Sequence, residues 1–172
     1  MSDILLNVSI NTPKWEKVLP EVEKLSSQIA TLTVNHVREK QPKPFLMLPK
    51  SLSFNLCLSN DTEVHALNKE FRQIDKPTNI LSFANIDDPL FDACLKSEDI
   101  IEMGDMIIAI ETLQKEAQLK NISLHNHFCH LLIHGILHLL GYDHIQDEDA
   151  TIMETLEIDI LHLLNISNPY EE

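Results

Sequence analysis

Residues 134–144 read His-Gly-Ile-Leu-His-Leu-Leu-Gly-Tyr-Asp-His, and the three histidines of this segment have the spacing of a metal-binding tripod. Residues four apart on a helix project from one face, about 6 Å apart at Cβ, so His134 and His138 can turn a ring nitrogen toward one ion. Gly141 follows, and a glycine there can adopt the left-handed conformation that ends a helix and reverses the chain. His144 then approaches from a third direction. We expect one Zn²⁺ ion at these three ligands.

Three protein ligands leave a fourth position on zinc for water, which is typical of a catalytic site rather than a structural one. The same spacing occurs in the zinc peptidase motif His-Glu-x-x-His-x-x-Gly-x-x-His, but Gly135 stands in place of its glutamate. Peptide hydrolysis needs that glutamate as a general base, so the sequence disfavours proteolysis. A phosphodiester fits better, because RNA carries its own nucleophile in the 2′-hydroxyl.

The bulk composition indicates one globular domain spanning residues 1–172. The chain is 44% hydrophobic, and its three cysteines form no C-x-x-C pair, so a reducing, cytoplasmic location fits best. The N-terminus has no basic leader, and the most apolar stretch, residues 131–140, is interrupted by two histidines. We therefore expect neither a signal peptide nor a membrane span.

The net charge of −14 has the wrong sign for a protein that coats nucleic acid by general electrostatic attraction. All 13 lysines and arginines lie within residues 1–120, so any phosphate contact must come from the first two thirds of the chain. Each basic residue taken alone is more simply a solvated side chain. The candidates are Arg38, Lys40, Lys43, Lys50, Lys69, Arg72 and Lys76.

Hydrophobic periodicity predicts an α+β domain in which a small mixed sheet packs against several helices, with a central histidine-bearing helix. The acidic segment 85–103 reads as a surface loop. We interpret His125, His127, His130 and His162 as packed or solvated residues, and Met153 as core. Expected strands cover residues 4–10, 51–58, 80–83 and 106–110; expected helices cover 15–32, 61–72, 112–120, 123–140 and a last one from about 147.

Four segments together resemble the bacterial YbeY endoribonuclease family. They are Leu67-Asn68 followed by Phe71-Arg72, the run Asp-Lys-Pro-Thr-Asn-Ile-Leu-Ser-Phe at 75–83, Gly-Asp-Met-Ile-Ile at 104–108, and residues 134–144. The resemblance implies that His134, His138 and His144 hold zinc and that Arg72 is a catalytic residue suited to a phosphate. It also implies cleavage of single-stranded RNA in the 3′-end maturation of 16S small-subunit rRNA, and ribosome quality control with ribosome-assembly factors as partners.

Two other functions are compatible with the residues. One is a metallopeptidase-like hydrolase with an unusual base, and Gly135 is the feature against it. The other is a non-catalytic ribosome-assembly module with a structural zinc, which the strong negative charge favours. Within the nuclease hypothesis, the attacking group is either water or the 2′-hydroxyl of the RNA.

Overall fold

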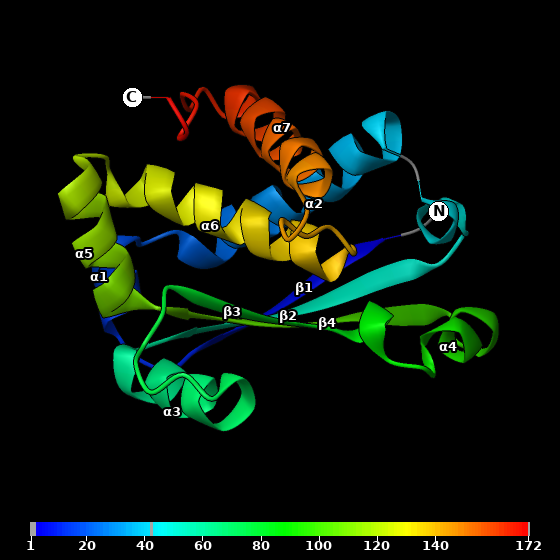
Figure 1. The fold of residues 1–172 in the computed structure, drawn as a ribbon, viewed down its shortest axis with the longest axis horizontal. Helices are drawn as coiled ribbons and strands as arrows, with labels where there is room; N and C mark the ends of the chain where they lie inside the picture. Colours follow the sequence, from blue (N-terminus) through cyan, green and yellow to red (C-terminus); the bar gives the residue numbers. More distant parts are fainter. Residues whose placement is uncertain (1–2, 42, 172) are drawn as a thin grey trace.

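A computed structural model describes residues 3–41 and 43–171, so the ends of the expected domain and residue 42 lie outside the described residues. Four strands of the described chain form one mixed sheet in the order β1-β2-β4-β3 (Figure 1). Strands β1, β2 and β4 are mutually parallel, and β3 runs antiparallel to β4 at one edge of the sheet. The strands are β1 (Ile4–Ile10), β2 (Ser51–Ser59), β3 (Ile80–Ala84) and β4 (Ile100–Ala109).

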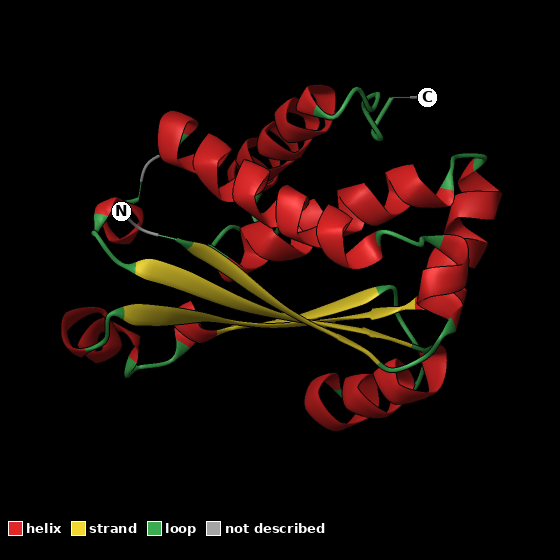
Figure 2. Ribbon diagram, turned by 180° about the vertical axis from the view of Figure 1, so that it is seen from behind, coloured by secondary structure: helices red, strands yellow, loops and turns green. Residues whose placement is uncertain are grey.

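The helices make two unequal layers about this sheet. Helices α2 and α6 cover one face, with α7 packed on both of them, and α3 lies against the other face (Figure 1); the view from behind shows the same layers (Figure 2). This arrangement confirms the predicted single α+β domain. The helices are α1 (Lys14–Val18), α2 (Val22–Lys40), α3 (Asp61–Arg72), α4 (Phe91–Ser97), α5 (Ile110–Lys120), α6 (Leu124–Leu139) and α7 (Asp147–Leu163), with 3₁₀ turns at Pro44–Met47 and Asn85–Asp87.

The core lies between the sheet and the α2, α6 layer. Strand β2 shows why: Leu52, Phe54, Leu56 and Leu58 alternate along it and are all at most 1% exposed. Residues two apart on a strand share a face, so these four point to the helices while the intervening polar residues point away. Each fully buried side chain of this kind contributes about 1.5–3 kcal/mol relative to an exposed one, so burial of this face fixes the register of the sheet.

The prediction of a loop over residues 85–103 was wrong. The segment contains the short helix α4, and β4 begins at Ile100. Exposed and buried residues alternate along β4 as far as Met103. There a β-bulge shifts the pairing register with β2, opposite Ser53 and Phe54. Gly104 next to the bulge has φ +135°, and a Cβ there would lie 2.2 Å from the carbonyl oxygen of Phe83. The bulge breaks the period-two pattern, which hid the first half of the strand.

Two helix boundaries also differ from expectation. The helix expected over residues 15–32 is divided into α1 and α2 near Pro20, and α2 continues to Lys40. Asn60, rather than Asp61, caps α3 by accepting a hydrogen bond from the backbone of Glu63. Asp61 instead accepts from the backbone and hydroxyl of Thr112, which ties α3 to α5.

Within the described part of the chain, no helix is both long enough and apolar enough to cross a membrane.

Candidate metal centre

Helix α6 and the turn after it position the three histidines. Ser123 begins the helix by accepting a hydrogen bond from the backbone N–H of Asn126 at 3.1 Å. At the other end Gly141 adopts φ +97°, and the backbone N–H of Tyr142 donates to the carbonyl of Leu137 at 3.0 Å. These are the features of a glycine-terminated helix, and they turn the chain so that His144 returns toward α6.

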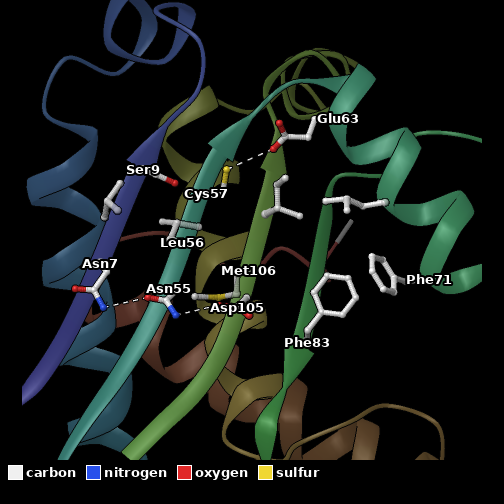
Figure 3. A pocket seen from close by; sticks show the side chains of 13 residues that line it. Asn7, Ser9, Asn55, Leu56, Cys57, Glu63, Phe71, Phe83, Asp105 and Met106 are labelled. Carbon is white, nitrogen blue, oxygen red and sulfur yellow. Dashed lines mark hydrogen bonds between the residues drawn. The ribbon is translucent and has the colours of Figure 1, made fainter. Parts of the chain in front are cut away.

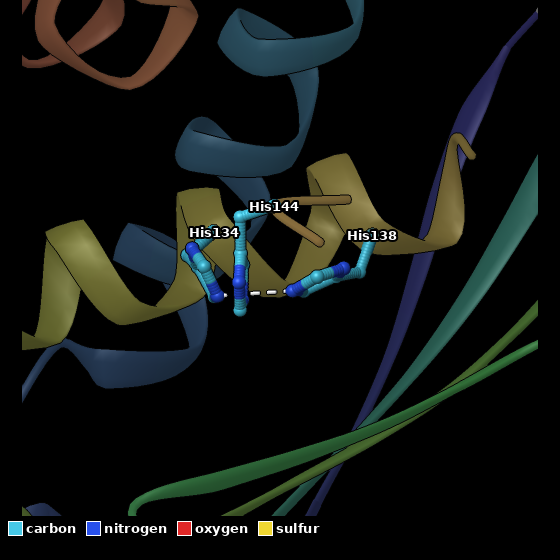
Figure 4. A group of neighbouring side chains, drawn as sticks. All are labelled: His134, His138 and His144. Carbon is cyan, nitrogen blue, oxygen red and sulfur yellow. Dashed lines mark hydrogen bonds between the residues drawn. The ribbon is translucent and has the colours of Figure 1, made fainter. Parts of the chain in front are cut away.

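The side chains of His134, His138 and His144 converge below α6 (Figure 4). One ring nitrogen from each lies within 4.8 Å of the others, so the three form a group that could hold a metal ion. The Nε2 atoms of His134 and His138 are 3.0 Å apart. Tetrahedral zinc with Zn–N bonds of about 2.1 Å would separate its nitrogen ligands by about 3.4 Å, so His134 and His138 need only a small adjustment to share one.

The hydrogen bonds at the opposite ring nitrogens assign the tautomers. His138 Nδ1 lies 2.9 Å from the carbonyl oxygen of Tyr142, and His134 Nδ1 lies 3.1 Å from a carboxylate oxygen of Glu157. Both partners only accept, so both Nδ1 atoms carry a proton and the Nε2 side of each ring is turned toward the other ring. The two Nε2 atoms face each other across 3.0 Å, and Nε2 is the ring atom that each histidine has left for a metal ion.

The protonation state of His138 is determined by its burial and by the groups around it. Burial, and next the positive charge of a protonated His134, lower the pKa of His138 to about 4, although its bond to the Tyr142 carbonyl acts in the opposite sense. His138 is therefore neutral near pH 7, which is the form that binds a metal. The donor set thus fits a zinc-type ion.

Glu157 on α7 is the residue that sequence reasoning missed. Its side chain is 1% exposed and accepts from His130 at 2.8 Å and from His134 at 3.1 Å. Burial alone would raise its pKa, but these hydrogen bonds outweigh that effect and lower the pKa to about 2. The sequence did carry a signal, because Glu157 stands four residues after the core residue Met153 and therefore on the buried side of its helix.

A second polar cluster lies beyond the tripod on α5 and α6. His127, 1% exposed, donates from Nε2 to Glu116 at 2.9 Å, and Asn79 donates to the same carboxylate at 3.0 Å. His127 and His130 are thus packed and hydrogen-bonded residues, as the sequence suggested. Asp143, beside the third histidine, accepts from the backbone of Ile145 at 3.3 Å, which is turn chemistry.

The three histidines open into a cleft of about 850 Å³ that Arg72 also lines. Arg72 is the last residue of α3 and reaches around the edge strand β3, where one guanidinium nitrogen donates to the carbonyl oxygen of Ser82 at 2.9 Å. Its guanidinium carbon lies 5.1 Å from the centre of the Phe83 ring. Arg72 and the three histidines, which are far from it in the sequence, therefore share one cavity, and among the described residues Ser82 accepts from one nitrogen of the guanidinium.

Of the seven basic residues named as phosphate candidates, Arg72 lines the cleft and the others do not. Lys43 lies in a neighbouring depression over the ring of Tyr142, and Lys50 donates to the carbonyl of Leu95. Lys120 lines the cleft and was not among the candidates. The cationic surface of the cleft thus comes from two side chains at the ends of α3 and α5.

Gly135 faces the sheet rather than the metal centre. A Cβ at this position would lie 2.7 Å from Cδ1 of Ile80 and 2.9 Å from Sδ of Met106. The glycine lets α6 cross closely over β3 and β4. A glutamate there would displace the ends of the Ile80 and Met106 side chains and would point its carboxylate toward the sheet, away from the metal centre.

Another cavity, of about 660 Å³, lies on the other face of the sheet beside α3 (Figure 3). Asn7 donates to Asn55 at 3.0 Å and Asn55 donates to Asp105 at 2.9 Å, so a row of polar side chains crosses three strands. None of the predicted site residues lines this cavity.

Comparison with known proteins connects this geometry to a family. The model of the family "Endoribonuclease YbeY" matches residues 11–165. A protein named Endoribonuclease YbeY from Paramagnetospirillum magneticum is 38% identical over 170 residues, covering 98% of this chain and 97% of that one. A namesake from Acinetobacter baumannii is 41% identical over 157 residues, covering 89% and 92%. A solution structure from Thermotoga maritima shares the fold, with a TM-score of 0.52, 21% identity, and coverage of 98% and 100%.

Proposed function

The chain belongs to the YbeY endoribonuclease family, and from this premise we propose that it is a zinc-dependent endoribonuclease specific for single-stranded RNA. Its relatives are named endoribonucleases, which are hydrolases of RNA phosphodiester bonds. The proposed role is 16S rRNA 3′-end maturation and ribosome quality control in the cytoplasm, together with ribosome-assembly factors.

One observation carries the metal-dependent part of this proposal. His134, His138 and His144 bring one ring nitrogen each to within 4.8 Å of the others, at the wall of a cleft that Arg72 also lines. A site for a divalent cation beside a guanidinium matches the needs of a phosphodiester, whose charge grows as its phosphorus is attacked.

The chain's own residues take separate roles in this mechanism. His134, His138 and His144 would hold the ion, with Glu157 and the Tyr142 carbonyl fixing two of the rings. Zinc supplies Lewis acidity, which polarises a phosphate oxygen or lowers the pKa of a water. Arg72 would bind the phosphate and neutralise its developing charge through the donors that Ser82 leaves free.

Product ends identify the attacking group. A 2′,3′-cyclic phosphate requires attack by the neighbouring 2′-hydroxyl, whereas direct formation of a 5′-phosphate end requires water. End-group analysis of a single cleavage event therefore assigns the nucleophile.

The central test compares the parent protein with His138→Ala. We expect loss of bound metal and of single-stranded RNA cleavage, with the circular dichroism spectrum retained, because a hydrolytic metal site need not hold the core together. His125→Ala is the matched control, since His125 is an exposed histidine of the same helix outside the cleft. Cleavage that persists in the metal-free variant would overturn the proposal.

A further inference from the structure

The charge of the cleft is too small to account for RNA binding by phosphate attraction. Apart from the proposed metal ion, its cations are Arg72 and Lys120, and its acids are Asp87 and Asp143. Each phosphate neutralised on a single strand contributes a slope of only about −0.7 to the dependence of log K on log salt, so two cations give weak, salt-sensitive attraction. The whole chain, at −14, repels the polyanion. A contact that does not depend on charge is therefore needed.

Tyr170, near the C-terminus, has the features of such a contact. Its side chain lines the cleft together with the three histidines, and the residue is 45% exposed. Its hydroxyl donates to the buried carboxylate of Glu157, with 3.0 and 3.1 Å to the two oxygens. The His130 ring meets it edge to face, with centroids 5.5 Å apart and planes at 86°. The hydroxyl of Tyr170 is thus anchored by Glu157, while nearly half of the residue's surface is exposed.

The second tyrosine of the cleft is already engaged. The ammonium of Lys43 lies 4.1 Å from the centre of the Tyr142 ring, and the Tyr142 hydroxyl donates to the carbonyl of Gln41 at 3.3 Å. Tyr170 is the more exposed of the two.

We propose that Tyr170 is a stacking platform for one unpaired nucleobase of the RNA, next to the phosphate bound at Arg72 and the metal. This inference rests on the proposed function and adds a substrate contact to it. Every base has a π-face, so stacking holds RNA without regard to sequence, and only an unpaired base can leave its own stack to reach the ring. The same contact therefore favours single-stranded over double-stranded RNA.

The test uses the metal-loaded full chain and a short single-stranded oligoribonucleotide with one 2-aminopurine, read by stopped flow before cleavage. Stacking on tyrosine quenches this fluorophore. Tyr170→Ala removes the ring, and we expect loss of quenching and a Kd raised about fivefold to a hundredfold. Tyr170→Phe keeps the ring but not its bond to Glu157, and we expect quenching to remain. Met47→Ala, an exposed apolar residue outside the cleft, is the control.

Equal weakening by Tyr170→Phe and Tyr170→Ala would overturn the inference, because it would assign the effect to the hydroxyl and Glu157. Unchanged binding by Tyr170→Ala would overturn it as well. Metal content measured on each variant separates RNA binding from a disturbed metal centre. Cleavage by the parent protein tests the proposed function separately. Quenching without cleavage would support the stacking contact and contradict the proposed nuclease activity.

Discussion

At the scale of single residues, Arg72 is the side chain whose role is most directly testable. Arg72→Ala removes the donors that would face the phosphate, and losing such a donor costs about a hundredfold or more in rate. We expect kcat/KM on single-stranded RNA to fall by about that factor with bound metal unchanged. Arg72→Lys should recover only part of the loss, because an ammonium lacks the planar fork of donors. A non-catalytic module with a structural zinc predicts no effect of either change.

Glu157 acts on the metal through His134. In Glu157→Gln the neutral amide accepts less strongly from His134 and His130, so the ring is held less firmly at the orientation that coordinates. Lost partners of this kind weaken metal affinity by roughly 10- to 100-fold. Competition with a chromophoric chelator measures that change directly. Glu154→Gln, an exposed acid on the same helix, should bind metal as the parent does; equal affinities for the two variants would deny Glu157 this role.

At the scale of elements, α6 packs closely over β3 and β4 at Gly135. Gly135→Glu gives the chain the complete residue pattern of the zinc peptidase motif. The new side chain, however, would contact Ile80 and Met106 and would bury a carboxylate without a partner. We expect loss of several kcal/mol of stability and no cleavage of unstructured protein. Urea unfolding and a casein assay measure the two effects. Gly135→Ala, which adds the Cβ alone, should be milder; a stable, proteolytic Gly135→Glu variant would contradict this account.

Elements also differ in how far the sequence predicts them. Helix α6 was predicted almost to the residue, because Ser123 and Gly141 mark both of its ends. Only the second half of strand β4 was predicted, because the bulge at Met103 interrupts its alternation. Local sequence therefore predicts an element whose hydrophobic period is constant from its first residue to its last. It does not predict an irregularity, such as a bulge, that depends on pairing with a strand distant in the sequence.

At the scale of the whole molecule, the residues of the site also differ in whether local sequence predicts them. The tripod lies within eleven residues, so its spacing alone indicates a metal site, and the structure brings its three ring nitrogens within 4.8 Å of one another. Glu157, Tyr170 and Lys120 lie outside this segment, and tertiary packing alone brings Tyr170 and Lys120 to the cleft and Glu157 against Tyr170 and His134. Arg72 was singled out from the seven basic candidates only through the family resemblance, since nothing in its local sequence places an arginine at the edge of β3.

The buried centre also makes the stability of the metal-free protein depend on pH. His138 has a pKa of about 4 in the folded protein against 6.5 when unfolded, so between these values the unfolded chain binds more protons and stability rises with pH. Glu157, at about 2 against 4.5, acts in the same direction at lower pH. We expect the urea midpoint in the presence of chelator to fall from pH 6.5 downward, and His138→Ala to flatten its upper part, between pH 6.5 and 4. A midpoint constant over that range in the parent protein would show that His138 is not held neutral by its surroundings.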